Sequence, residues 1–300
     1  MFWRVILSWR AFLAVLFWGF SFIGTKIVLR EIHPFTLLPI RYGLGSLFLL
    51  SIQLSQNRSF FRKFSSRDWI SIFILSSVGV SGLGLLQAFG LLYTTAIHTG
   101  WIIAINPLLI TLSARFFLGE AFTMRKMIGV LSGFVGVFLI ITKGVFSFSF
   151  FRFTSTYGDF LVLLSALAWT AFTVGGKGFL SRYAPMPTIT AIMLSGWIVL
   201  LPLGVLKGEW ERLFYLSLPA WGGIFFLGLC CSGLGYLFWY SALEKRDSTT
   251  VGVYLYFEPL ATLIGAYFLL GEEIRWVTLL GGAMILFGVF IATQNSRKKY

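Results

Sequence analysis

Ten apolar segments constrain what this chain of 300 residues can fold into. About 20 helical residues cross the hydrocarbon core of a bilayer, and each segment meets or approaches that length. With 57% hydrophobic and 12% charged residues, the chain has too little polar surface to coat a water-soluble globule. We therefore expect an all-α polytopic membrane protein with helices at about residues 11–30, 35–54, 69–92, 96–118, 124–142, 158–179, 187–206, 218–242, 249–270 and 275–293.

The two halves of the sequence repeat one another. Glu272 follows Glu120 by 152 residues, and Pro259 follows Pro107 by the same interval. The tetrapeptide SGLG at 81–84 returns at 232–235, an interval of 151 residues. An ordered series of this kind indicates an internal duplication.

Each copy contains five predicted helices, so the second copy must enter the membrane from the opposite side to the first. The halves are thus expected to be inverted repeats, an architecture that places binding sites near the midplane where the repeats face each other. The predicted organisation is a first repeat at 1–142, a connection at 143–157, a second repeat at 158–293 and a basic cytoplasmic tail at 294–300.

The basic residues predict the orientation of the chain. The net charge is +13, but Lys and Arg lie between the apolar segments rather than in one patch, which argues against a nucleic-acid partner. If the N-terminus is cytoplasmic, the inside segments hold fourteen cations and the outside segments six. We expect a multi-pass protein of the bacterial cytoplasmic (inner) membrane, with both termini cytoplasmic and an uncleaved first helix.

Several motifs carry a family resemblance. Gly-Glu precedes a glycine-rich helix in both repeats (GEAFTMRKMIGVLSGFVGV and GEEIRWVTLLGGAMILFGV), the first helix contains FWGFSFIGTK, and the ninth contains FEPLATLIGAYFLLGEE. From about residue 11 to 293 the chain resembles the EamA-type ten-helix members of the drug/metabolite transporter superfamily. The resemblance implies transport of a small metabolite, often efflux of amino acids or related compounds. It also implies that the segments holding Gln87 and Trp101 line the cavity.

Glu258 is the acid that lies deep inside an apolar segment. Its helix starts near Thr249, so Glu258 is roughly 13 Å into a core about 30 Å thick. A charge there is costly, so the carboxyl must be protonated, paired or facing a wet cavity. Two interpretations remain open: a substrate-amine ligand or proton acceptor, and a structural carboxylate satisfied by a neighbouring helix.

The repeat counterpart of Glu258 is the neutral Asn106, so any titration would belong to one half alone. A proline follows each of these two residues, at Pro107 and Pro259. Because proline removes a helix hydrogen bond, these positions are candidate hinges.

Two stripes of side chains at helical spacing are candidates for the cavity wall. They are Trp18, Phe22 and Lys26 in the first helix and Trp169, Thr173 and Lys177 in the sixth. We expect the stripes to face one cavity from opposite halves. Ordinary packing of the tryptophans, and snorkelling or helix-end pairing of the lysines, are the alternatives.

Tyrosines extend the candidate site. Tyr254 lies four residues before Glu258, and Tyr236 and Tyr240 have the same spacing on the eighth helix. Aromatic walls with few polar groups suit a ligand with an aromatic or apolar side chain. In a chain with 18% aromatic residues, rings that face lipid or core are the competing interpretation.

Other features receive structural interpretations. Arg41 and Arg115 are expected to snorkel to the membrane interface as anchors. Adjacent Cys230 and Cys231 lack the partners of a metal site and are read as packing residues. Repeated glycines are expected to permit close helix packing; they are Gly129, Gly133, Gly136, Gly281, Gly282 and Gly288.

An enzyme is disfavoured. The GxSG pattern at Gly79–Gly82 is typical of intramembrane serine proteases, but Ser81 would need a histidine base, and His98 is predicted at the membrane edge. We predict a secondary transporter that moves a small metabolite by alternating access, by efflux, without catalytic residues, metal or cofactor. A membrane scaffold or lipid-binding protein is the alternative. Substrate, direction, oligomeric state, and proton coupling versus uniport stay open.

Overall fold

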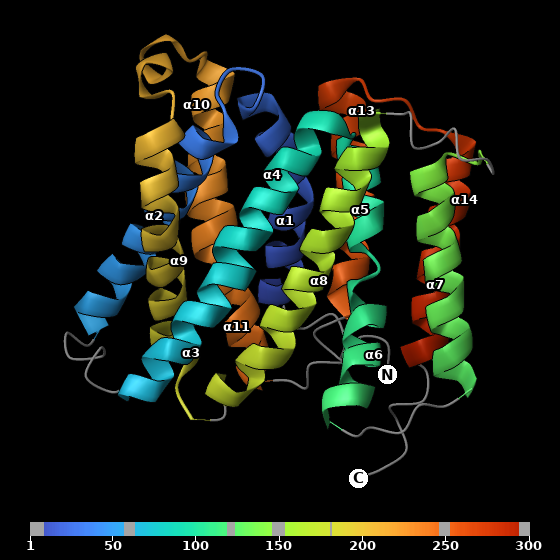
Figure 1. Ribbon diagram of the computed structural model, residues 1–300, viewed down its shortest axis with the longest axis horizontal. Coiled ribbons are helices and arrows are strands. Elements are labelled where there is room, and N and C mark those ends of the chain that lie inside the picture. The colour runs from blue at the N-terminus through green and yellow to red at the C-terminus, as the bar shows by residue number, and fades with distance from the viewer. Residues whose placement is uncertain are drawn as a thin grey trace.

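The computed structural model describes residues 9–56, 64–118, 124–145, 154–180, 182–245 and 253–293, and the elements there are helices (Figure 1). In chain order they are α1 (Trp9–Val28), α2 (Pro34–Gln56), α3 (Ser66–Ser76), η3 (Ser77–Gly82), α4 (Leu83–Tyr93), α5 (Ala96–Ile103), α6 (Asn106–Leu118), α7 (Met124–Thr142), α8 (Thr154–Leu180), α9 (Pro185–Lys207), η5 (Trp210–Tyr215), α10 (Leu218–Phe225), η6 (Phe226–Gly235), α11 (Tyr236–Lys245), η7 (Val253–Tyr256), α13 (Phe257–Leu270) and α14 (Trp276–Thr293).

The all-α, ten-segment prediction is confirmed. Within the described residues, six helical stretches are long and apolar enough to cross a membrane, and four shorter apolar helices fall in the other predicted segments. Large apolar side chains such as Phe268 and Trp276 are exposed on the outside of the bundle. Such surfaces are costly in water and ordinary against lipid.

Four predicted segments contain breaks that their hydropathy does not reveal. The SGLG motif of each repeat reaches into a π-helical stretch, η3 or η6. The predicted helix 96–118 is divided into α5 and α6, and in the second repeat the 3-10 turn η7 precedes α13. Asn106 and Glu258 therefore stand in the first turns of α6 and α13.

The helices pair across the repeats. In Figure 1, α2 lies beside α9 and α7 beside α14, and α1 runs through the centre against α13 and η6. We call the end with the connections 29–33, 94–95 and 271–275 the upper end, as drawn. The end with 64–65 and 182–184 is the lower end. Connections of both repeats meet at each end.

Four of the glycines predicted to allow close packing do so between α7 and α14, while Gly133 and Gly282 face Leu108 and Trp101. A Cβ on Gly281 would lie 2.7 Å from the Gly136 carbonyl oxygen, and one on Gly288 would meet the Gly129 carbonyl still more closely. Ser132 Oγ donates to the Met284 carbonyl 2.9 Å away at the same crossing. Small residues let two backbones approach closely where no hydrophobic force acts between helices.

Candidate functional site

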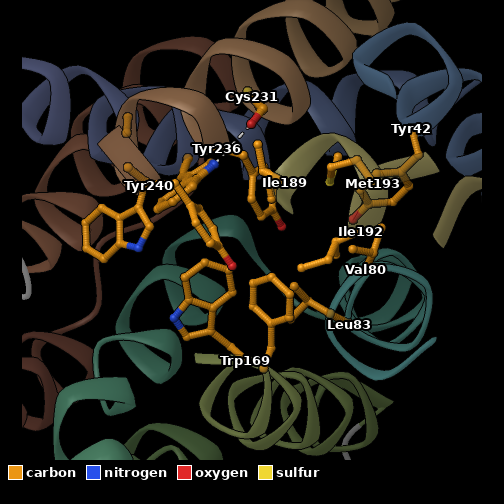
Figure 2. Close-up of a cluster of buried hydrophobic side chains, with 14 of the residues drawn as sticks. Tyr42, Val80, Leu83, Trp169, Ile189, Ile192, Met193, Cys231, Tyr236 and Tyr240 are labelled. Carbon is orange, nitrogen blue, oxygen red and sulfur yellow. Dashed lines mark hydrogen bonds between the residues drawn. The ribbon is translucent and has the colours of Figure 1, made fainter. Parts of the chain in front are cut away.

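Aromatic side chains from three helical stretches meet in the middle of the bundle. We call this set the aromatic cluster: Trp18 of α1, Trp169 and Phe172 of α8, and Tyr236, Trp239 and Tyr240 of α11. Figure 2 shows Trp169 of α8 opposite Tyr236 and Tyr240, which both come from α11. Ring centroids in the cluster lie 5.3 to 6.3 Å apart, mostly edge to face, a geometry that the ring quadrupoles favour.

Trp18 is fixed at the centre of the aromatic cluster. Its indole Nε1 donates to the Cys231 carbonyl at 3.1 Å, and its ring meets Trp169, Tyr236 and Trp239. Cys231 belongs to the π-helical stretch η6. Because π-helical turns frequently mark functional sites, the position of this acceptor supports more than a packing role for Trp18.

The structure therefore brings together four predicted site residues, Trp18, Trp169, Tyr236 and Tyr240. Within the described residues the hydroxyl groups of Tyr236 and Tyr240 make no hydrogen bond, although both side chains are 4% exposed. Polar groups inside a protein are nearly always satisfied, by the protein or by water. These two are consequently candidates for contact with a ligand or with water.

Glu258 lies close to the same centre. The side chain is 6% exposed, and among the described residues its carboxylate has neither an ion-pair nor a hydrogen-bond partner. Thr262 Oγ1, which contacts the Glu258 carbonyl, lies 2.9 Å from the carbonyl of Gly19, so α13 is bound to α1 beside Trp18. The predicted neighbour Tyr254 is buried in the hydrophobic core that also holds Trp18. Within the described residues no neighbouring helix satisfies the Glu258 carboxylate, and both interpretations of this residue stay open.

Asn106 and Trp101 carry further polar atoms of interest. Asn106 Oδ1 and Trp101 Nε1 are buried, and the described part of the chain gives them no hydrogen-bond partner. Asn106 begins α6 and Pro107 follows it, as Pro259 follows Glu258 near the start of α13. The first turns of broken helices carry a partial positive charge and recur at transporter binding sites.

The remaining predicted site residues lie elsewhere or are half-buried. Phe22 packs in the other hydrophobic core, with Trp101, and not with Trp18. Trp18 and Lys26 do not share one face of α1, because a helix turns about 80° beyond two full turns over eight residues. Gln87 and Thr173 are half-buried, and the side chain of Lys177 lies outside the described residues.

Lys26 belongs to a polar contact set at the upper end. Its Nζ lies 3.4 Å from Glu272 Oε1 and donates to the Thr94 carbonyl. Glu272 also accepts from the backbone N–H groups of Ala96 and Ile97, at 2.8 and 2.9 Å, and so caps α5. We call Lys26, Thr94 and Glu272 the upper clasp. This geometry agrees better with the alternative interpretation, in which Lys26 pairs at a helix end, than with a place for Lys26 in the cavity wall.

A second clasp joins the repeats at the lower end. Arg182 NH1 lies 3.0 Å from Asp68 Oδ1, and the Tyr183 hydroxyl donates to Asp68 Oδ2 at 2.8 Å. Asp68 stands in the first turn of α3, while Arg182 and Tyr183 connect α8 to α9. We call these three residues the lower clasp.

Arg41 corrects an expectation. It was expected to snorkel to the interface, but the side chain is 7% exposed and points between helices. Nε donates to Ser232 Oγ at 3.1 Å, and NH1 lies 3.5 Å from Thr25 Oγ1. Arg41 stands inside α2 where that helix packs on η6, so these inner hydroxyls hold its head away from the interface. The counterpart expectation for Arg115 falls on a side chain outside the described residues.

Comparison with known proteins decides the family. The model of the EamA-like transporter family matches this chain twice, at residues 6–142 and 156–294. The chain belongs to the EamA-like transporter family. Both matched ranges together hold every residue of the aromatic cluster and of the two clasps.

Full-length relatives agree with the family. An uncharacterized transporter of Archaeoglobus fulgidus is 33% identical, over 95% of this chain and 96% of its own. The uncharacterized transporter YyaM of Bacillus subtilis is 26% identical, over 93% and 90%. A protein of Streptantibioticus cattleyicolor, named "Probable terminal-alkyne amino-acid exporter", is 25% identical, over 96% and 93%. A crystal structure at 18% identity shares the fold, with a TM-score of 0.69 and 95% of each chain covered.

Some residues of this EamA-like site escaped sequence reasoning. Phe172 and Trp239 complete the aromatic cluster, and Asp159 pairs with His98 at 3.2 Å near the upper end. The position of Phe172, three residues after Trp169, was the available signal. Ser81 donates to the Gly196 carbonyl instead of meeting a histidine, consistent with a family of transporters rather than enzymes.

Proposed function

We propose that this EamA-like transporter exports a small metabolite, an amino acid or a related compound, which is held at the aromatic cluster and moved by alternating access. The observation that carries the proposal is the contact between Trp18 and Trp169, with ring centroids 5.4 Å apart. These residues hold equivalent positions in the two repeats and meet in the middle of the bundle. Binding sites of inverted-repeat carriers lie where the repeats face each other.

In this proposal the two clasps determine which end of the bundle is closed. Each clasp joins residues of both repeats at one end of the bundle, with Glu272 and Asp68 as the acids. Rocking one repeat on the other would break one clasp while the other holds. The site between them would then open to one side of the membrane at a time.

The likeness to an exporter supports the substrate class and direction. The Streptantibioticus relative is named as an amino-acid exporter, and the aromatic cluster offers a wall for an apolar or aromatic side chain. In the proposal Glu258 accepts the substrate amine or a proton. The proposal retains the predicted organisation, with repeats at 1–142 and 158–293, a connection between them and a tail at 294–300. It places the protein in a bacterial inner membrane with both termini in the cytoplasm.

Flux in proteoliposomes tests the proposal. Purified protein would be reconstituted, and counterflow of radiolabelled amino acids measured with aromatic and aliphatic members in the panel. We expect at least one aromatic or large apolar member to move, and Trp18→Ala to reduce its flux about tenfold or more. Leu167→Ala, at a side chain 48% exposed on α8, should transport normally. A folded protein that moves no amino acid would favour the scaffold or lipid-binding alternative.

A further inference from the structure

Arg41 is a buried cation inside a membrane-spanning helix. It lies seven residues after Pro34, about 10 Å along α2 from the start of that helix. Charged side chains at such depths are costly, so they normally pair, face a cavity or carry function. Arg41 is 7% exposed, so lipid-facing solvation is closed to it.

The partners of Arg41 leave its charge uncompensated. A guanidinium group has five N–H donors, and its two polar contacts among the described residues end on the neutral hydroxyls of Ser232 and Thr25. The third contact is the Tyr42 ring, 5.4 Å from Cζ. Among the described residues no carboxylate lies within ion-pair distance of Arg41. An anion is the missing element of this arrangement.

The second repeat shows that packing does not require the cation. The position equivalent to Arg41, 151 residues later, is Ile192, which is 0% exposed on α9. Ser81, the equivalent of Ser232, donates to the Gly196 carbonyl of α9 at 2.8 Å. The equivalent crossing, of α9 on η3, is thus held by an aliphatic side chain and a hydroxyl-to-backbone bond. Replacement of buried charges by apolar residues is often neutral for stability, so a retained charge calls for another reason.

The guanidinium group adjoins the aromatic cluster. Ser232, which accepts from Arg41 Nε, follows Cys231, which accepts from Trp18 Nε1. Arg41 and Trp18 therefore contact consecutive residues of η6. A molecule whose apolar part contacts Trp18 would thus have the guanidinium group one residue further along η6, as a partner for an acidic group.

We propose that Arg41 binds the carboxylate of the transported metabolite, with Ser232 and Thr25 orienting the guanidinium group. This inference rests on the proposed function and narrows it to substrates with an acidic group and an apolar or aromatic body. Arginine suits the task because its planar fork binds a carboxylate through two parallel hydrogen bonds.

Binding of matched acid and amide probes tests the inference apart from transport. The shift in thermal unfolding of the full chain in detergent would be measured with L-phenylalanine, phenylacetate, and their carboxamides. A ligand that binds the folded state raises the unfolding temperature. We expect the acids to shift the wild type more than the amides. Arg41→Met should weaken acid binding at least about tenfold, the loss of one charge-assisted bond, and abolish the preference.

Further variants keep the test informative if Arg41→Met unfolds. Arg41→Lys retains charge without the fork and should bind the acids more weakly than the wild type. Ser232→Ala should weaken acid binding several-fold, whereas its repeat equivalent Ser81→Ala should not. An equal response of the wild type to acid and amide, or none to either, overturns the inference. So does a preference for phenylphosphonate over both acids, or an acid preference that survives in Arg41→Met. Acid binding without any flux in proteoliposomes would remove the transport proposal and leave the Arg41 assignment standing.

Discussion

Trp18 and Trp169 occupy equivalent positions in the two repeats, and their rings meet edge to face with centroids 5.4 Å apart. A residue that contacts its own equivalent lies on the axis that relates the repeats. Ser132 and Met284, 152 residues apart, also meet, through a 2.9 Å hydrogen bond between α7 and α14. The axis therefore passes through the aromatic cluster and the glycine-lined helix pair. Of these two places, the aromatic cluster has unpaired polar groups beside it.

Cysteine reactivity tests whether that axis lies in a cavity. In a background with Cys230 and Cys231 replaced, Trp18→Cys and Trp169→Cys should react with a small hydrophilic thiol reagent, and a transported substrate should slow the reaction several-fold. The reason is that a bound ligand covers the same rings. Leu167→Cys, which is exposed on α8, is the control and should not respond to substrate. Unreactive cysteines in a carrier that still transports would leave ordinary packing as the role of the tryptophans.

The upper clasp should contribute to stability through a pair and a cap. Lys26→Met is expected to lower the free energy of unfolding by about 0.5–1 kcal/mol, because the Lys26 side chain is 25% exposed and the pair partly screened. Glu272→Ala should cost more, about 1–2 kcal/mol, since it also removes the cap of α5. Denaturation in detergent, with the double variant, measures both. Strictly additive effects would show that Lys26 and Glu272 do not interact.

Glu31 gives the upper end a dependence on pH. It lies in the connection between α1 and α2, where the Ser217 hydroxyl and then the Ser217 backbone N–H lower the pKa of Glu31 below its ordinary 4.5. A lowered pKa in the folded state adds stability above about 4.5, which is lost as the pH falls through the folded value. Glu31→Gln should thus destabilise at pH 7, by less than about 1 kcal/mol because the contact is solvent-screened.

Thermal unfolding at pH 7 and at acid pH measures the Glu31 effect. The difference between wild type and Glu31→Gln should shrink as the pH drops below the ordinary value of 4.5. Glu211→Gln, at an exposed residue of η5, should behave as the wild type at both. A Glu31 effect that is constant with pH would exclude the carboxylate as its source.

Labelling from each side of the membrane tests the orientation. The fourteen-to-six distribution of cations places residues near Asn57 in the cytoplasm and those near Ser149 outside. Cysteines at these two positions, which lie outside the described residues, should each be labelled from one side only. The reverse labelling pattern would show that the protein has the opposite orientation in the membrane.

The fold could be predicted because its signals are local and additive. The length of the apolar segments predicted ten membrane helices, and intervals such as that from Pro107 to Pro259 predicted the internal duplication. The paired glycines Gly129 and Gly288 follow from the same logic, since small residues have few other uses in a helix facing another helix. These signals need no knowledge of which helices become neighbours.

The site was predictable only in part, because its members come from helices whose contacts the sequence does not state. Trp18 and Trp169 were found through their equivalent positions, yet Phe22 and Lys26 diverge from them as α1 turns. Arg41 was misread because its depth alone permits snorkelling. Its burial depends on the hydroxyl of Ser232, 191 residues away in sequence. The apolar equivalent Ile192 was the signal that could have singled it out.

Glu258 separates two mechanisms. In proton-coupled exchange, substrate and proton compete for this carboxylate; in uniport, it only bonds the ligand or holds α13 in place. Its carboxylate has no partner among the described residues, and it stands in the first turn of α13, where the helix end favours a negative charge. Without a fixed partner the carboxylate can take up a proton, and the helix end favours its release. The group could thus alternate between both forms as the site opens to each side, so we expect the coupled mechanism.

Glu258→Gln keeps shape and hydrogen bonding and removes the titrating group. An imposed pH gradient should drive substrate accumulation in proteoliposomes of the wild type and not of the variant, while counterflow without a gradient continues in both. Asn106→Asp is the matched variant, because it places an acid at the equivalent residue of the first repeat, where one is absent. If Asn106→Asp restores accumulation to Glu258→Gln, the two half-helices are interchangeable as proton sites. Gradient-driven accumulation that persists in folded Glu258→Gln alone would rule out Glu258 as the proton site, because no titrating group would remain at that position to carry the proton.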